Sequence, residues 1–324
     1  MKPSKTTIEA QGDEQRGSIR PLENNYVRIR SAAVFLFFFV LSVPSLFAQK
    51  IVEVSYTTDQ QGNYRFTCNN KAFCTYVLRV ELPTMKNLRS DHALPFEAEV
   101  RPGFNQLFVL SPINKAEDTQ VGFRASNRKG CMQPVVNPNF VYVLPIGPGM
   151  ETQAFRINAV HSTGQDSAYT VRLKMNVDDT IYAARRGIVT AVDVSNTEND
   201  AGATTTGSWN YVEIVHADCS FGQYGVFKKD GAFVRPGQQV EAGTPLGLVG
   251  GDKFGRGSDV RFSVVYPGQQ GNTQIAPVFW TKGNGKGQLR QGASYTAEFP
   301  KVILTQESTK KATATKKTTV KKKA

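Results

Sequence analysis

Residues 234–250, which read VRPGQQVEAGTPLGLVG, decide the fold of this chain. The stretch follows the pattern V-x-x-G-x-x-V-x-x-G-x-x-L-G-x-x-G, in which short apolar steps alternate with glycines. Glycine is needed at tight turns between very short strands, because other residues resist a positive φ angle. The pattern therefore indicates a sheet of short, closely turned strands, and it says little about activity.

The rest of the chain shows the same preference for strands. No long segment has the i, i+3, i+4 apolar spacing of an amphipathic helix. Short runs of alternating apolar residues, separated by Gly, Pro, Asn and Asp, recur throughout. We therefore predict that the body of the protein is all-β.

Turn-forming residues divide this body into two regions. Alternating apolar residues stand at positions 64–68, 76–82 and 96–100. They predict a small, β-sandwich-like N-terminal domain over residues 49–135. A proline-rich connection, QPVVNPN at residues 133–139, precedes the second region, which covers residues 140–300 and has shorter strands richer in glycine.

An apolar segment near the N-terminus predicts export. Residues 32–48 (AAVFLFFFVLSVPSLFA) follow Arg28 and Arg30 and end in a small residue that suits signal peptidase cleavage. The alternative is a transmembrane anchor, but an apolar run interrupted by Pro44 is at the lower limit for spanning a bilayer. We therefore predict that residues 1–48 are an N-terminal extension plus a signal peptide. The mature protein would lie in the periplasm, in the cell envelope or outside the cell.

The formal net charge of +12 is concentrated at the C-terminus. From Ser308 onward the chain holds seven lysines and no acidic residue, and residues 1–48 hold an excess of two positive charges, which leaves +3 for the body. We predict a Lys-rich disordered tail over residues 306–324. Its functional interpretation is contact with anionic envelope polymers or lipid, and the alternative is a solvated end. The nearly neutral body predicts no specific nucleic acid partner.

The four cysteines are Cys68, Cys74, Cys131 and Cys219. Export would bring them into an oxidising compartment, where disulfides persist. The close spacing of Cys68 and Cys74 could staple a short hairpin, but spacing alone does not decide among the three possible pairings, and four buried thiols are the alternative.

Four stretches between residues 140 and 265 carry a family resemblance. They read YVLPIGPG at 142–149, YTVRLKM at 169–175 followed by TIYAARRGIV at 180–189, NYVEIVH at 210–216, and YGVF at 224–227. In this order they resemble the lead-in, the "YAVDF-M…GTPV-AA-GVV" block, the "N-V-I-H" strand and the Y-x-H-L motif of lysostaphin/LytM-type zinc metalloendopeptidases. The resemblance implies a LytM-like antiparallel β-sheet, built as a duplicated hybrid motif, and peptidoglycan as the family's substrate.

The glycine pattern of residues 234–250 also occurs in biotinyl and lipoyl carrier domains. Those domains present a modifiable Lys at a hairpin tip between two glycine-patterned halves. In this chain Lys253 follows the pattern, within GGDKF, and lacks that setting. The peptidase resemblance is therefore preferred.

Most of the family's functional positions hold other residues in this chain. The family binds zinc through a His, the Asp of its "VDF" block and the second His of an H-L-H-F motif. His161 matches the first ligand, whereas Arg172 stands at the Asp position. The H-L-H-F motif reads DVRF, which puts Asp259 at the catalytic His and Arg261 at the zinc-binding His, and Val226 replaces the His of the Y-x-H motif. A guanidinium stays protonated and has no lone pair for a metal, so the resemblance implies a remnant site at His161 without zinc or another cofactor.

The chain has three histidines, His92, His161 and His216. His161, His216 and Asp259 together have residue types that could bind zinc in a rebuilt site, and His216 lies near the site in the family's fold. The two arginines in the same pocket oppose it, because they would repel Zn²⁺. The preferred interpretation is that His161 and His216 are hydrogen-bonded structural histidines.

The degenerate groove implied by the resemblance consists of His161, Arg172, His216, Val226, Asp259 and Arg261. Within it, Arg172, Asp259 and Arg261 are expected to lie together. One interpretation is a mutual Arg–Asp–Arg cluster that fills the place of the zinc. The other is that one Arg has spare donors and receives a carboxylate of a peptidoglycan stem peptide.

These substitutions predict a non-catalytic pseudo-peptidase of the cell envelope. It would bind peptidoglycan or regulate a cell-wall hydrolase through the degenerate groove. The alternatives are a peptidoglycan metalloendopeptidase with an unusual zinc site and a purely structural envelope protein. The sequence contains no G-x-S-x-G elbow, no H-E-x-x-H motif and no phosphate-binding loop that would indicate other chemistry.

Overall fold

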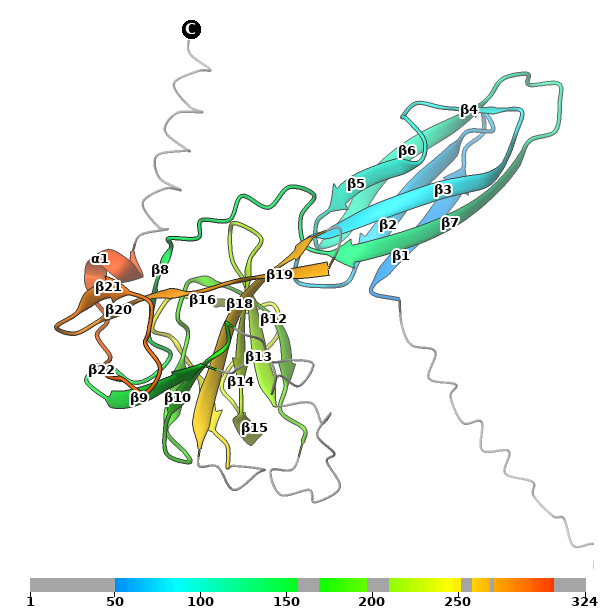
Figure 1. The fold of residues 1–324 in the computed structure, drawn as a ribbon. Coiled ribbons are helices and arrows are strands. Elements are labelled where there is room, and N and C mark those ends of the chain that lie inside the picture. Colours follow the sequence, from blue (N-terminus) through cyan, green and yellow to red (C-terminus); the bar gives the residue numbers. More distant parts are fainter. Residues whose placement is uncertain (1–49, 157–168, 197–209, 252–257, 269–270, 306–324) are drawn as a thin grey trace, which may run out of the picture. The chain divides into compact units, whose positions relative to one another are not determined.

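The computed structural model describes residues 50–156, 169–196, 210–251, 258–268 and 271–305 (Figure 1). All of them belong to one compact unit, Gln49–Ala324. Their regular secondary structure is almost entirely β-strand, with one short helix, so the predicted all-β class is confirmed. The predicted export signal, His161 and the Lys-rich tail lie outside the described residues. Among those that are described, no helix is long and apolar enough to cross a membrane.

The N-terminal part, residues 50–130, consists of two antiparallel sheets and is called the sandwich below. One sheet has the strand order β1-β2-β6-β4 and the other β5-β3-β7 (Figure 1). The strands are β1 (Val52–Thr58), β2 (Tyr64–Asn70), β3 (Tyr76–Lys86), β4 (Leu88–Ser90), β5 (Phe96–Val100), β6 (Gly103–Pro112) and β7 (Gln120–Lys129). Apolar residues of both sheets meet in one core, in which Phe66 and Leu78 are fully buried. The alternating runs of the sequence are therefore the core-facing strands that they predicted.

The C-terminal part, residues 141–305, is called the sheet region. Its main element is a nine-stranded antiparallel sheet with the order β16-β12-β13-β14-β18-β10-β9-β22, in which β19 pairs with β18. The strands are β9 (Glu151–Arg156), β10 (Val171–Lys174), β12 (Gly187–Asp193), β13 (Tyr211–Val215), β14 (Phe221–Gly225), β16 (Gln239–Val240), β18 (Asp259–Gly268), β19 (Gly271–Ile275) and β22 (Ser294–Thr296).

Two small sheets and a helical turn complete the sheet region. One sheet has the order β11-β17-β15 and the other β21-β20-β8, in which β20 and β8 run parallel. These elements are β8 (Val141–Val143), β11 (Thr180–Tyr182), β15 (Phe227–Ala232), β17 (Pro245–Val249), β20 (Val278–Thr281), β21 (Gly285–Gly287) and α1 (Lys301–Leu304).

The glycine-patterned stretch forms short strands joined by tight turns, as its spacing predicts. Gly237 precedes β16 with a φ of +87°, and Gly243 lies between β16 and β17 with a φ of +82°. Both values belong to the left-handed region, which favours glycine. Gly247 has a different role, since a Cβ there would lie 2.5 Å from the main-chain oxygen of Gly231. These glycines allow neighbouring strands to turn sharply and to approach closely.

The nine-stranded sheet has an apolar face and a polar face. Side chains alternate along each strand, and directly opposed residues of paired strands share a face. The apolar face packs into the core of the sheet region and includes Leu173, Val212, Ile214, Tyr224 and Phe262. The alternate residues define the polar face, which includes Arg172, Glu213, Phe221, Gln223, Asp259, Arg261, Ser263 and Val265.

One disulfide links the two parts of the chain. Cys131, just after the sandwich, pairs with Cys219, in the turn between β13 and β14, and their Cα atoms are 6.0 Å apart. Cys68 and Cys74 are free and buried. The hairpin staple considered for Cys68 and Cys74 is therefore not formed: Cys68 packs within the sandwich core, whereas Cys74 belongs to a separate cluster with Phe221.

Candidate functional site

Arg172, Asp259 and Arg261 form an ion-pair cluster on the polar face. Strands β10 and β18 are antiparallel neighbours and place Arg172 directly opposite Arg261. The Nε atom of Arg172 donates to Asp259 Oδ2 over 2.8 Å, and Nη2 of the same arginine also contacts that oxygen. The Nε atom of Arg261 donates to the other oxygen, Oδ1, over 3.3 Å. The carboxylate of Asp259 thus neutralises part of the repulsion between two cations that face each other.

Arg172 is the more accessible of the two arginines. Its side chain is 24% exposed, compared with 12% for Arg261 and 8% for Asp259. A guanidinium has five N–H donors, and Arg172 directs two of its nitrogen atoms at Asp259. Its third nitrogen, Nη1, has no hydrogen-bond partner among the described residues. This arginine can therefore still donate to an anion that approaches the polar face.

The cluster does not fit a zinc ion. Guanidinium groups offer no lone pair to a metal, and both oxygens of Asp259 already accept hydrogen bonds from them. In the part of the chain that the structure describes, no three His, Cys, Asp or Glu side chains are grouped so that they could hold a metal ion. His161, the matching ligand position, is outside that part. With two arginines and one aspartate, the cluster carries one net positive charge and suits an anionic group.

Val226 occupies the corner between β14 and β15. Its side chain is buried and apolar, so it can neither transfer a proton nor bind a metal. Its φ angle is +73°, a conformation that costs a β-branched residue free energy of roughly 1–3 kcal/mol. Two main-chain hydrogen bonds hold the corner: Val226 N donates to Asn210 O over 2.9 Å, and Gly250 N donates to Val226 O over 2.9 Å.

His216 lies on the opposite side of the sheet from the ion-pair cluster. It continues the alternation of Val212 and Ile214 on the apolar face, and its ring is 6.3 Å from that of Tyr142 between centroids. Asp259 is on the polar face, so the structure does not bring these two residues together. The rebuilt zinc site considered for His161, His216 and Asp259 is therefore not supported by the described geometry.

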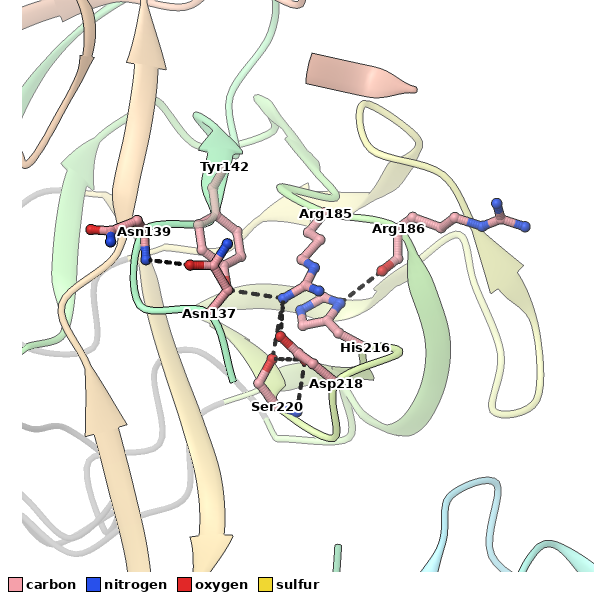
Figure 2. Close-up of polar contacts among 8 residues, drawn as sticks. All are labelled: Asn137, Asn139, Tyr142, Arg185, Arg186, His216, Asp218 and Ser220. Carbon is pink, nitrogen blue, oxygen red and sulfur yellow. Dashed lines mark hydrogen bonds and ion pairs between the residues drawn. The ribbon is translucent and has the colours of Figure 1, made fainter. Parts of the chain in front are cut away.

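His216 is buried as a neutral ring. Its Nδ1 donates to the main-chain oxygen of Arg186 over 2.8 Å, because a carbonyl can only accept, and Nε2 has no partner among the described atoms (Figure 2). Burial, with a further contribution from the positive charge of Arg185, lowers the pKa of His216 to about 3. Gly222 leaves room for the ring, since a Cβ there would lie 3.0 Å from Nε2. His216 is thus a hydrogen-bonded structural histidine.

A buried arginine beside His216 was not anticipated from the sequence. Arg185 is almost fully buried, and its Nη1 donates to Asp218 Oδ2 over 2.9 Å and to Ser220 Oγ over 3.4 Å (Figure 2). Its guanidinium carbon also lies 3.7 Å from the centroid of the Phe140 ring. In the sequence, Arg185 directly follows the apolar run TIYAA. An arginine at the exposed end of a strand would give the same pattern, so the sequence did not indicate that Arg185 is buried.

This buried cluster is not a nucleophilic site. The hydroxyl of Ser220 donates to Asp218 Oδ1 over 2.7 Å, so its hydrogen points to a carboxylate and not to His216 (Figure 2). Burial raises the pKa of Asp218, but the charge of Arg185 and the hydrogen bonds from Ser220 outweigh it, and the pKa is lowered overall. The ionised carboxylate therefore pairs with Arg185 and stabilises the turn between β13 and β14.

A second polar network occupies the middle of the polar face. Glu213 is buried and pairs with Lys129, the last residue of the sandwich strand β7. Its carboxylate also accepts from Thr190 Oγ1 over 2.6 Å and from Gln223 Nε2 over 3.2 Å. Ser263 Oγ donates to Gln223 Oε1 over 3.4 Å and so extends the network along β18. Sequence alone did not single out any of these residues.

Comparisons with known proteins agree with the sequence blocks. Residues 166–274, from just before β10 to near the end of β19, match the model of Peptidase family M23. No curated protein matches the chain.

Three solved structures that are similar to this chain are peptidases or M23 proteins. The catalytic domain of the antimicrobial peptidase lysostaphin from Staphylococcus simulans is 18% identical, over 39% of this chain and 80% of that chain, with a TM-score of 0.26. The catalytic domain of the prophage-encoded M23 protein EnpA from Enterococcus faecalis is 19% identical, over 45% and 95% of the two chains, with a TM-score of 0.27. The M23 metalloprotease pseudoalterin, from the deep sea, is 14% identical over 50% and 96%, with a TM-score of 0.33. Across residues 166–274, which include three of its four sequence blocks, the chain resembles peptidase family M23, as those blocks predicted.

Proposed function

We propose that this protein is an exported, non-catalytic relative of the M23 peptidases that binds peptidoglycan through the polar face of its sheet. The observation that carries the proposal is the cluster in which Arg172 and Arg261 both donate to Asp259. These three residues stand where the resemblance places two zinc ligands and a catalytic histidine. Since a guanidinium cannot bind zinc or act as a base at neutral pH, the peptidase reaction lacks its groups here.

The cluster retains a feature that suits a binding role. Peptidoglycan stem peptides carry free carboxylates, and arginine forms strong, geometrically specific hydrogen bonds with a carboxylate. Arg172 is partly exposed, and its Nη1 has no partner among the described residues. We therefore assign the recognition of a stem-peptide carboxylate to Arg172, with Asp259 and Arg261 holding its side chain in place.

Calorimetric titration of the purified mature chain with muropeptides tests this assignment. Arg172→Ala is expected to weaken binding by about tenfold or more, the usual effect of losing a charge-assisted hydrogen bond. Arg290→Ala is the matched control, because Arg290 is an exposed arginine of the same region outside the polar face. Equal affinities for the wild type and Arg172→Ala would remove the assignment.

Metal analysis and a peptidoglycan turbidity assay test the absence of catalysis. The expected result is substoichiometric zinc and no clearing of a peptidoglycan suspension. Stoichiometric zinc together with clearing would establish the alternative, a metalloendopeptidase with an unusual zinc site. Binding to a purified cell-wall hydrolase in place of muropeptides would show that the polar face regulates an enzyme instead.

A further inference from the structure

The sandwich and the sheet region meet at a small joint. The joint is defined by Cys74, Lys129 and Cys131 on one side and by Glu213, Cys219, Phe221 and Val265 on the other. Both sides belong to the one compact unit Gln49–Ala324. Its contacts are the disulfide, the ion pair between Lys129 and Glu213, an apolar cluster, and the packing of Phe73 on Gly237 and of Gly130 on Pro267.

The noncovalent part of the joint is small in comparison with the two cores. Cys74, Phe221 and Val265 are the buried members of its apolar cluster, and the partly buried Ala72, Tyr76 and Val215 pack against them. Lys129 Nζ lies 4.5 Å from the centroid of the Phe221 ring. The sandwich and the sheet region each have a larger core, and these two cores have no residue in common. Each part therefore has its own source of stability, and the joint could open without either part unfolding.

The disulfide lies at the accessible edge of the joint. Cys219 is partly exposed and follows the exposed Ala217 and the partly exposed Asp218. On the other side, Met132 follows Cys131 and is 40% exposed. Access to a thiolate is one of the factors that control the rate of thiol–disulfide exchange. Cys131 itself is buried, so a reductant in solution reaches this bond from the side of Cys219 while the joint is still closed.

We propose that the Cys131–Cys219 disulfide is a thiol-controlled lock on the joint. In the oxidised protein the bond holds Lys129 against Glu213 and keeps the apolar cluster closed. After reduction, the ion pair, the small apolar cluster and the contacts of Phe73 and Pro267 no longer hold the two parts together, so the joint opens while both cores stay folded. The opened protein presents Glu213, Phe221 and Val265 to solvent, and this inference does not depend on the proposed ligand.

The reduction step needs a dithiol, such as a dithiol oxidoreductase or dithiothreitol. One thiolate of the reductant attacks a sulfur of the disulfide and releases the other cysteine as a thiol. The second thiol of the reductant then attacks the mixed disulfide and releases the remaining cysteine. Two electrons pass from the dithiol to the bond, so the reductant ends as a disulfide and Cys131 and Cys219 end as two thiols.

The two free cysteines of this chain provide a built-in probe. Cys74 is buried in the joint, whereas Cys68 is buried in the sandwich core. Burial raises the pKa of each thiol to about 11, so both are expected to react slowly with an alkylating reagent in the closed protein. Opening of the joint exposes Cys74 and leaves Cys68 in its core.

The test compares the oxidised wild type with the double variant Cys131→Ser/Cys219→Ser, both as full chains without reductant. These two proteins contain the same two free thiols, and mass spectrometry gives the alkylation rate of each by N-ethylmaleimide. The proposal predicts that Cys74 reacts about tenfold or more faster in the variant, while Cys68 reacts at an unchanged rate. The wild type treated with dithiothreitol serves as a second measurement, since its only disulfide is Cys131–Cys219.

Two results would overturn the proposal. Slow alkylation of both Cys68 and Cys74 after reduction would show that the noncovalent contacts alone keep the joint closed. Fast alkylation of both would show that the disulfide maintains the sandwich fold itself and is not a lock between two stable parts. If the double variant does not fold, the reduced wild type decides between these outcomes by the same two rates.

Discussion

Replacing Asp259 by Asn is expected to destabilise the sheet region by about 3 kcal/mol. Removing one member of a buried ion pair costs roughly 3–5 kcal/mol, because the charge that remains is left uncompensated. Partial solvent access to Arg172, which is 24% exposed, lowers this cost. Arg172 and Arg261 would then face each other directly across β10 and β18, and this repulsion raises the cost again. Solvent at the exposed side of Arg172 screens this repulsion too, so the expected loss lies near the lower end of the range.

Urea unfolding followed by tryptophan fluorescence measures this loss. Of the two tryptophans, Trp280 lies in β20 of the sheet region, and its signal reports on that region, whereas Trp209 lies outside the described residues. Arg172→Met is the matched variant, because it removes one cation and leaves Asp259 paired with Arg261. Its expected cost is about 1 kcal/mol. The double variant Asp259→Asn/Arg172→Met is expected to be more stable than Asp259→Asn alone, since the facing cations are gone.

Two results would contradict the predicted role of Asp259. A loss below about 1 kcal/mol for Asp259→Asn would show that solvent already screens the two arginines effectively. A double variant no more stable than Asp259→Asn alone would show that their mutual repulsion is negligible. Either result would mean that Asp259 does not hold the cluster together.

Three further predictions concern other parts of the fold. The pKa of His216 is about 3 in the folded protein and 6.5 in the reference state, so the unfolded chain takes up this proton first as the pH falls below 6.5. The free energy of unfolding should therefore fall by about 2 kcal/mol between pH 7 and pH 5, and His216→Asn should flatten this part of the profile in urea titrations at each pH. Gly187→Ala should destabilise the protein by several kcal/mol, because its Cβ would lie 2.3 Å from a main-chain oxygen, whereas Gly287→Ala, with nothing within 4 Å, should lower the thermal midpoint little. Lys129→Met should cost about 2 kcal/mol in thermal or urea unfolding, because Glu213 stays buried without its cation, and Lys129→Arg should recover most of it. A Lys129→Met protein as stable as the wild type would mean that Thr190 and Gln223 satisfy Glu213 by themselves.

Much of the fold could be predicted because it depends on local rules. A left-handed turn restricts the residue at Gly237 and Gly243 whatever the rest of the chain does, so spacing alone located the short strands. Period-two alternation likewise located β2, β3 and β5, because each of them buries one side against the sandwich core. Strand pairing is not local, and the order of the nine-stranded sheet, in which β18 lies between β14 and β10, was not available from the pattern.

The candidate site also has some features that the sequence could predict and others that only the strand pairing shows. The motif DVRF puts Asp259 and Arg261 on one face by alternation, but only the pairing of β10 with β18 shows that Arg172 contacts the same carboxylate. His216 could have been placed from sequence, since NYVEIVH puts it in phase with Val212 and Ile214. The partner of Cys131 could not, because 88 residues separate it from Cys219 and no local rule acts over that distance.

At the corner formed by Val226, the path of the main chain and the chemistry of the side chain have different determinants. Its left-handed backbone is held by main-chain bonds to Asn210 and Gly250, and these bonds involve no side-chain atom. A change of residue at this corner alters which groups are packed there and leaves these main-chain bonds in place. Because main-chain bonds hold this corner, the chemical groups at this position can change while the fold stays the same.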